Sequence, residues 1–163
     1  MAVEFANLFV AAAMRRAGLD AWIPEGDGKW SLPLQFLPAG AGWVELMRLD
    51  PGVRVGLHRH TGEVHALTLA GERRLNDGRV LRAGDYVYEP AGNVDWWEAA
   101  GKEQLLVHVV VKGSVEYLGA HHSVLQRIDT ADRIAEYRRH CAAVGSRPRI
   151  QDCLDRGGQS RAG

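Results

Sequence analysis

Residues 52–71 constrain the fold more than any other part of the chain. His58 and His60 are one residue apart, and side chains with that spacing point to the same side only in an extended strand. A Thr-Gly turn follows, and the returning strand carries His65. Three imidazoles on facing positions of one hairpin indicate a metal site inside a β-structure.

Short strands separated by turns fill the chain from Trp22 to about Gly119. Residues 50–52 (Asp-Pro-Gly) form a turn in which Pro presets φ and Gly accepts positive φ, and residues 76–78 (Asn-Asp-Gly) carry a hairpin signal. Many short strands joined by short turns favour a closed all-β barrel or sandwich over an α/β fold.

Helical patterns flank the strands on both sides. Residues 3–17 place apolar side chains on one face, and residues 129–144 do the same after Asp129 or Thr130, either of which can cap a helix. We therefore expect four segments, which are an N-terminal helical segment (1–21), a barrel (22–119), a C-terminal helical segment (120–156) and a flexible tail (157–163).

The composition narrows the class of partner. Lys and Arg together number 20, and Asp and Glu together also number 20, so the charges balance and no basic surface for nucleic acid is indicated. No stretch approaches the roughly 20 apolar residues of a membrane span. Two cysteines are too few for a disulfide framework, which favours a reduced, cytoplasmic setting.

Two motifs resemble those of the cupin superfamily, a family of small metal-binding β-barrels. The positions that fit are a glycine, a His-x-His pair and a second glycine in one motif, and a glycine followed by Pro-x-Gly in the other: Gly52, His58, His60, Gly71, Gly84, Pro90 and Gly92. The resemblance implies a single cupin β-barrel, that is, a double-stranded β-helix or jelly roll. The usual Glu of the first motif is replaced by His65 and the usual His of the second by Asp95.

Within the cupins, the chain is similar to enzymes of the 2,4′-dihydroxyacetophenone dioxygenase and acetylacetone dioxygenase type. The similar phrases are residues 58–65, 84–92 and 115–118. Such enzymes use a non-haem iron held by three histidines to cleave a C–C bond beside a carbonyl with O₂. The resemblance also implies a homodimer.

The expected metal ligands are His58, His60, His65 and Asp95, holding one divalent transition metal per chain. Iron(II) is the first expectation, with zinc, nickel or manganese as alternatives. His65 has a second interpretation, as a histidine that hydrogen-bonds substrate or a ligand. Asp95 has two others, as a base that contacts substrate or as the cap of the preceding turn.

Three more residues are candidates for the site. Glu63 either orients His58 or His60 or forms a surface salt bridge. His108 lies in an apolar strand and is either an acid/base group beside the metal or a satisfied core histidine. Trp97 shares the face of Asp95 and either lines a substrate pocket or packs in the core.

The first function hypothesis is a metal-dependent enzyme acting on a small carbonyl or enol compound, by oxidative C–C cleavage with O₂. In it, Asp95 or His108 deprotonates the carbon beside the carbonyl. The alternatives are a lyase, isomerase or hydrolase that uses the metal as a Lewis acid, and a cupin that binds a metal or ligand without turnover.

Overall fold

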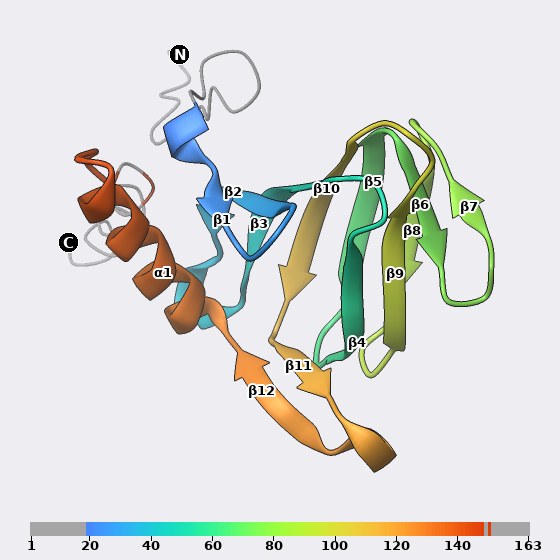
Figure 1. The fold of residues 1–163 in the computed structure, drawn as a ribbon. Helices are drawn as coiled ribbons and strands as arrows, with labels where there is room; N and C mark the ends of the chain where they lie inside the picture. The colour runs from blue at the N-terminus through green and yellow to red at the C-terminus, as the bar shows by residue number, and fades with distance from the viewer. Residues whose placement is uncertain (1–18, 149, 151–163) are drawn as a thin grey trace, which may run out of the picture.

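The computed structural model describes residues 19–148 and 150, and within them the strands form two antiparallel six-stranded sheets that face each other (Figure 1). The predicted helix at 3–17 and the tail at 157–163 lie outside these residues. The first sheet contains β1 (Ile23–Pro24), β2 (Lys29–Phe36), β3 (Gly42–Leu49), β10 (Leu105–Lys112), β5 (Val64–Ala70) and β8 (Tyr86–Glu89), in that order. The second contains β12 (Val124–Ile128), β11 (Val115–Leu118), β4 (Arg54–His60), β9 (Val94–Ala100), β6 (Glu72–Leu75) and β7 (Val80–Leu81).

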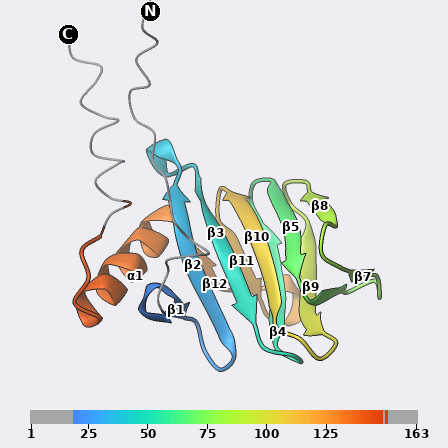
Figure 2. The same cartoon turned by 90° about the horizontal axis from the view of Figure 1, so that it is seen from above.

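Strands far apart in sequence are neighbours in both sheets. Figure 2 shows β10 between β3 and β5, so that the last long strand completes the first sheet. The order agrees with the predicted all-β cupin barrel. Short 3₁₀ turns at Leu19–Ala21, Pro38–Gly40 and Ala120–His122 complete the described elements, in which no helix is long and apolar enough to cross a membrane.

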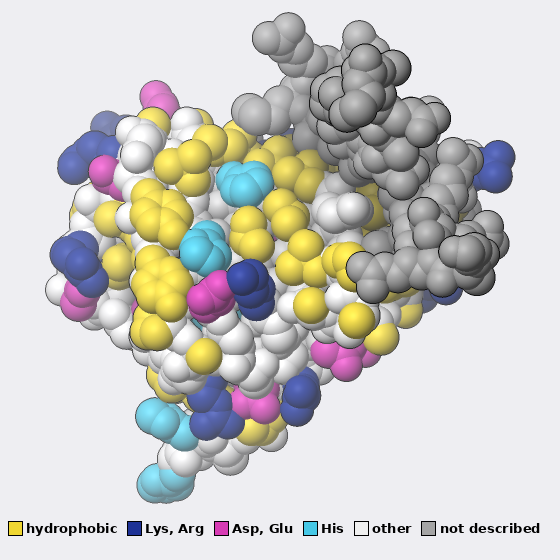
Figure 3. All heavy atoms as spheres, turned by 180° about the vertical axis from the view of Figure 1, so that it is seen from behind, with side chains coloured by type: hydrophobic (Ala, Val, Ile, Leu, Met, Phe, Trp, Pro, Cys, Tyr) yellow, Lys and Arg dark blue, Asp and Glu magenta, His cyan; other side chains and the backbone are white. Residues whose placement is uncertain are grey.

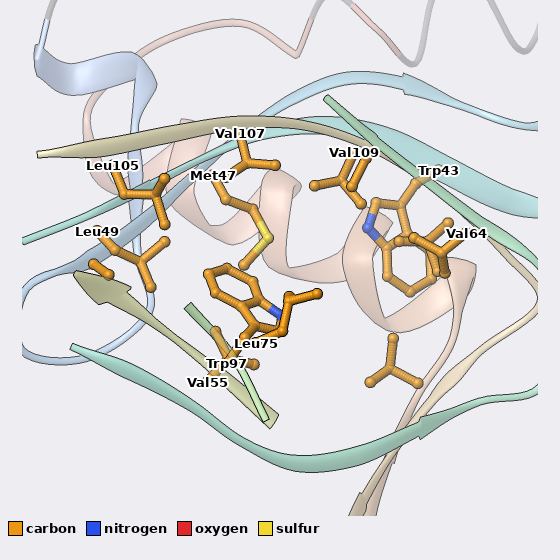
Figure 4. Close-up of a cluster of buried hydrophobic side chains, with 14 of the residues drawn as sticks. Trp43, Met47, Leu49, Val55, Val64, Leu75, Trp97, Leu105, Val107 and Val109 are labelled. Atoms are coloured by element: carbon orange, nitrogen blue, oxygen red, sulfur yellow. The ribbon is translucent and has the colours of Figure 1, made fainter. Parts of the chain in front are cut away.

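The core lies between the sheets. Leu49, Leu105 and Val107 are fully buried, and in Figure 4 their side chains point toward Met47 and Trp97. Burying each large apolar side chain contributes about 1.5–3 kcal/mol. Alternation along β10 buries its odd-numbered residues and leaves the even-numbered ones on the outer face.

The C-terminal helix is α1 (Thr130–Ala143), as the pattern predicted. Asp129 is its N-cap and forms a reciprocal capping box with Asp132, which satisfies two backbone N–H groups. Figure 2 shows α1 beside β2. Thr130 donates a hydrogen bond to the carbonyl oxygen of Gly40, at 3.0 Å, which fixes the start of the helix to the barrel.

The predicted end of the barrel at residue 119 is wrong by one strand. β12 pairs with β11 and extends the second sheet to Ile128. Its first four residues, Val124 to Arg127, are exposed. Backbone hydrogen bonds therefore hold this edge strand, and its sequence lacks the buried alternation that marks the other strands.

Candidate functional site in the barrel cavity

A cavity of about 70 Å³ lies between the two sheets. It has room for several water molecules or one compact organic molecule. Most of its wall is apolar, but several charged or polar side chains line it: Glu25, Lys29, Glu45, His58, His60, Arg73, Glu89, Tyr117 and Arg133.

A β-bulge directs His58 and His60 into this cavity. Val55 pairs with Trp97 and His58 with Asp95, so β4 contains one residue more than β9 between these pairs. The carbonyl oxygen of Gly56 in the bulge lies 2.8 Å from Nδ1 of His58. That contact places the proton on Nδ1 and leaves Nε2 as the lone-pair nitrogen of His58.

The two imidazoles lie close together and uncharged. Their ring centroids are 4.8 Å apart in an edge-to-face arrangement. Burial lowers the pKa of His58, and burial together with the neighbouring His58 lowers the pKa of His60 to about 4. Both rings are therefore neutral at physiological pH.

Glu89 on β8 brings a carboxylate to the same pair. Its Oε2 atom lies 3.6 Å from Nε2 of His60, and its Oε1 atom accepts a hydrogen bond of 3.3 Å from Arg73. Asn93 also donates to Oε2, at 3.2 Å. Arg73 is 2% exposed, and its guanidinium carbon lies 4.3 Å from the centroid of the Trp97 ring. A cation and an anion are thus both buried beside His60.

Asp95 is buried on the inner face but does not line the cavity. Its Oδ1 atom has no hydrogen-bond partner among the described residues. Burial raises the pKa of Asp95, and the nearby Glu89 adds to that effect while Arg73 opposes it. Asp95 therefore interacts with the Arg73–Glu89 pair, and its predicted role as metal ligand or base stays a prediction.

His65 lies on the outer face of the barrel, so the prediction that it points toward the metal is wrong. In β5, Val64 and Ala66 face inward, and the alternation turns His65 outward. Its Nδ1 atom lies 2.6 Å from the hydroxyl of Tyr86, and its Nε2 atom lies 3.5 Å from Oε1 of Glu63. Figure 3 shows histidines exposed among hydrophobic side chains on this side of the molecule.

Glu63 belongs to the same surface group, which supports the salt-bridge interpretation over the orienting one. The Lys112 ammonium donates to its Oε1 atom at 2.5 Å, and the Tyr88 hydroxyl donates to Oε2 at 3.4 Å. The predicted contact of Glu63 with His58 or His60 is absent from the hydrogen bonds of the described residues.

His108 lies on the outer face of the barrel, whereas Trp97 lies on the inner face. His108 pairs with Leu46 and Leu67 on the outer face of the first sheet, while Val109 next to it lines the cavity. The predicted acid/base role of His108 inside the barrel is therefore wrong. Trp97 is 4% exposed and lines the cavity, so it forms part of both the core and the pocket.

Within the described part of the chain, no group of three or more His, Cys, Asp or Glu side chains is placed to hold a metal ion. His58 and His60 supply two suitable nitrogen donors. Glu89 is the carboxylate beside His60, but Arg73 and Asn93 already occupy its oxygens.

The sequence interpretation missed Arg73 and Glu89, although alternation could have indicated both. Arg73 lies two residues before the buried Leu75, and Glu89 lies two residues after Val87, which packs against the core. Tyr86 and Tyr88, which alternate with Val87 and Glu89, are both exposed.

A second charged group closes the part of the cavity near α1. Arg133, which is 6% exposed, donates hydrogen bonds to Glu25 at 2.5 Å, to Ser31 at 2.8 Å, and to Glu45. Lys29 lies 3.0 Å from the other oxygen of Glu25. Burial alone would raise the pKa of Glu25, but Arg133 and Lys29 lower it to about 2, which keeps the carboxylate ionised.

Comparison with known proteins places these features in a family. The model of the ChrR cupin-like domain matches residues 12–116. No curated protein matches the chain. Among solved structures, an RmlC-like cupin protein from Ralstonia eutropha JMP134 has 23% identity and a TM-score of 0.74, covering 78% of this chain and 85% of its own.

Two further solved structures share the fold. A protein of unknown function with a cupin-like fold, also from Ralstonia eutropha JMP134, is 24% identical with a TM-score of 0.68, covering 72% of this chain and 75% of its own. An acetylacetone dioxygenase from Acinetobacter johnsonii is 14% identical with a TM-score of 0.69. The match covers 82% of this chain and 96% of the dioxygenase chain. At these identities the likeness concerns the fold alone.

Proposed function

The chain belongs to the family of ChrR cupin-like domains, and on that premise we propose that its barrel cavity transfers a proton beside the carbonyl group of a small organic molecule. The observation that carries the proposal is the placement of a neutral His60 beside the buried Glu89–Arg73 pair in a mostly apolar cavity. Titratable groups that are buried and held next to a specific charged partner in a cavity are typical of reactive sites.

Each member of this group has a separate task. Nε2 of His60 accepts the proton from the carbon beside the carbonyl, and Glu89 stabilises the imidazolium that forms, from 3.6 Å away. The electron pair moves to the carbonyl oxygen, which becomes an enolate. Arg73, whose side chain lines the cavity, stabilises the charge on that oxygen electrostatically. Return of the proton to a different atom completes an isomerisation.

Deuterium exchange in D₂O tests this step. Proton NMR measures loss of the methylene signal next to the ketone, at C3 of 2-oxobutanoate or at C4 of 2,3-pentanedione, with and without the protein. We expect exchange faster than in buffer, and a fall of about 10²-fold or more in His60→Ala. If the protein does not accelerate the deuterium exchange of either compound above the rate in buffer, the proposal is overturned.

A metal-dependent reaction of the dioxygenase type is the second candidate function. Nδ1 of His58 contacts a backbone carbonyl, and this contact is the usual way in which a protein orients a metal-binding histidine. The acetylacetone dioxygenase of the same fold gives the reaction class. The two histidines would need a third donor, which residues 19–148 and 150 do not provide.

Metal removal separates the two candidates. Under the first proposal, protein treated with a chelator should still catalyse deuterium exchange, because the proton transfer uses only protein side chains. The second candidate instead requires iron(II) binding that disappears in His58→Ala, together with O₂ consumption on a β-diketone. Consumption of O₂ only after iron addition would favour the second candidate.

We further propose that two copies of the chain associate through the outer face of the first sheet. Tyr86 is 58% exposed and Tyr88 is 52% exposed there, and Leu67 lies beside Tyr86 in register. Exposed large hydrophobic side chains that cluster on one face are typical of interfaces. Light scattering should give the mass of a dimer, and Tyr86→Lys should shift it toward the monomer.

A further inference from the structure

Lys29 is a partly buried cation that the proposed proton transfer does not use. It is the first residue of β2, and alternation places it on the inner face with Ser31. Its side chain is 14% exposed and lines the same cavity as His58 and Tyr117. Buried lysines are rare unless a partner compensates for the lost hydration.

Lys29 shares its partner, Glu25, with Arg133. Glu25 accepts from Lys29 through Oε2, at 3.0 Å, and from Arg133 through Oε1, at 2.5 Å. Among the described residues, Glu25 is the carboxylate within ion-pair distance of Lys29. An ammonium group has three N–H donors, so two of them are available to a molecule in the cavity.

The other charged groups of the wall are already paired. Glu89 accepts from Arg73, and Glu25 and Glu45 both accept from Arg133. Lys29 therefore has donors open to a ligand, and Arg73 lines the same cavity beside Glu89. Lys29, Arg73 and His58 all line this one cavity.

Lys29 stays charged in this environment. Burial disfavours the ammonium form, but the Glu25 carboxylate outweighs that effect and raises the pKa of Lys29. A permanent cation with free donors in an apolar cavity favours a ligand that brings a negative charge.

We infer that the cavity receives a compact organic anion, with a carboxylate held by Lys29 and a carbonyl oxygen near Arg73. The inference rests on the proposed function, because it assigns the substrate class of that same site. The charge of the ligand decides its affinity through Lys29, whereas the carbonyl decides whether a proton can be transferred.

Two probes of similar size, one anionic and one neutral, test the inference. 2-Oxobutanoate and 2,3-pentanedione share an ethyl ketone, but the first has a carboxylate where the second has an acetyl group. Calorimetry at low salt should show at least about tenfold tighter binding of 2-oxobutanoate. In Lys29→Met this preference should disappear, with binding of the diketone unchanged within about twofold.

Three variants make the result specific. Lys29→Arg should keep the preference, because the positive charge remains. Lys112→Met removes a surface lysine bound to Glu63 and should keep it too, which controls for net charge. Lys29→Gln, which keeps an N–H donor but no charge, replaces Lys29→Met if thermal melting shows that Met disrupts the fold.

The outcomes for the two proposals differ. Equal affinity for both probes in the wild-type protein, or an unchanged preference in Lys29→Met, would overturn the anion inference while deuterium exchange on the diketone could still be fast. Preferred binding of 2-oxobutanoate without faster exchange would overturn the proton transfer and leave the anion site standing. Absence of binding by both probes would overturn the inference.

Discussion

Nε2 of His60 lies 3.6 Å from Oε2 of Glu89, and both side chains are buried inside the barrel. The two residues are 29 positions apart in sequence and belong to different sheets. Arg73 lies on the far side of this contact and donates to the other oxygen of Glu89. The charge balance of the cavity therefore depends on three elements that meet only in the folded protein.

Removing Arg73 should destabilise the fold strongly. In Arg73→Met, the Glu89 carboxylate remains buried without its cation, which costs about 3–5 kcal/mol in the free energy of unfolding. Urea denaturation measures it. Arg74→Met is the matched control, because Arg74 is half exposed and pairs with Glu98 at the surface, so its loss should cost less than about 1 kcal/mol.

A double variant identifies the cause. If uncompensated charge is responsible, Arg73→Met combined with Glu89→Gln should recover part of the lost stability. Equal costs for Arg73→Met and Arg74→Met would contradict the buried pair.

The stability of the protein should fall as the pH decreases from about 6.5 to about 4. The pKa of His60 is lowered from 6.5 to about 4 in the folded state, so the unfolded chain binds a proton that the folded chain rejects. The stabilisation is fully present above pH 6.5 and is lost through this window, by about 3 kcal/mol for His60. Urea denaturation at several pH values measures the slope.

His60→Gln supplies the comparison for the pH experiment. Its free energy of unfolding should vary less between pH 7 and pH 4 than that of the wild-type protein. Parallel curves for the two proteins would mean that His60 takes up its proton without cost in the folded state.

The turn between β4 and β5 should not tolerate a side chain at Gly62. A Cβ atom there would lie 2.4 Å from the carbonyl oxygen of Lys112, so the backbone must shift. We expect Gly62→Ala to cost about 1–3 kcal/mol. Gly56→Ala is the control, because no atom lies within 4 Å of a Cβ at that position, and its effect should stay within about 0.5 kcal/mol. Similar melting temperatures for both variants would contradict this packing.

Removing the outer histidine should leave the site intact. His65→Ala loses an exposed contact with the Tyr86 hydroxyl, so the free energy of unfolding should change by less than about 1 kcal/mol. Deuterium exchange should stay at the wild-type rate, whereas His60→Ala, inside the cavity, should reduce it. Loss of exchange in His65→Ala would show that His65 reaches the site.

Local patterns in the sequence predicted much of the architecture. The spacing of His58 and His60 gives one inner face, and the Pro- and Gly-containing turns separate the strands close to their observed ends. Asp129 caps α1 because its side chain and that of Asp132 act within one helical turn. In each case the interacting groups are neighbours in sequence.

The face that β5 buries depended on the fold. Val64 and Ala66 face inward because they lie opposite Val111 and Val109 of β10, but Leu67 and Leu69 make the other face apolar as well. The sequence alone thus allowed His65 on either side. A shift of one residue decides between a cavity histidine and a surface one.

The sequence by itself determined the short-range features, namely the strands, their turns, the paired histidines of β4 and the cap of α1. Only the tertiary structure placed Glu89 and Arg73 beside His60. It also brought Lys29 into the same cavity as His58. Alternation fixes which side chains of one strand share a face. Which strands share a cavity, and so which charges meet there, depends on sheet pairing between residues far apart in the chain.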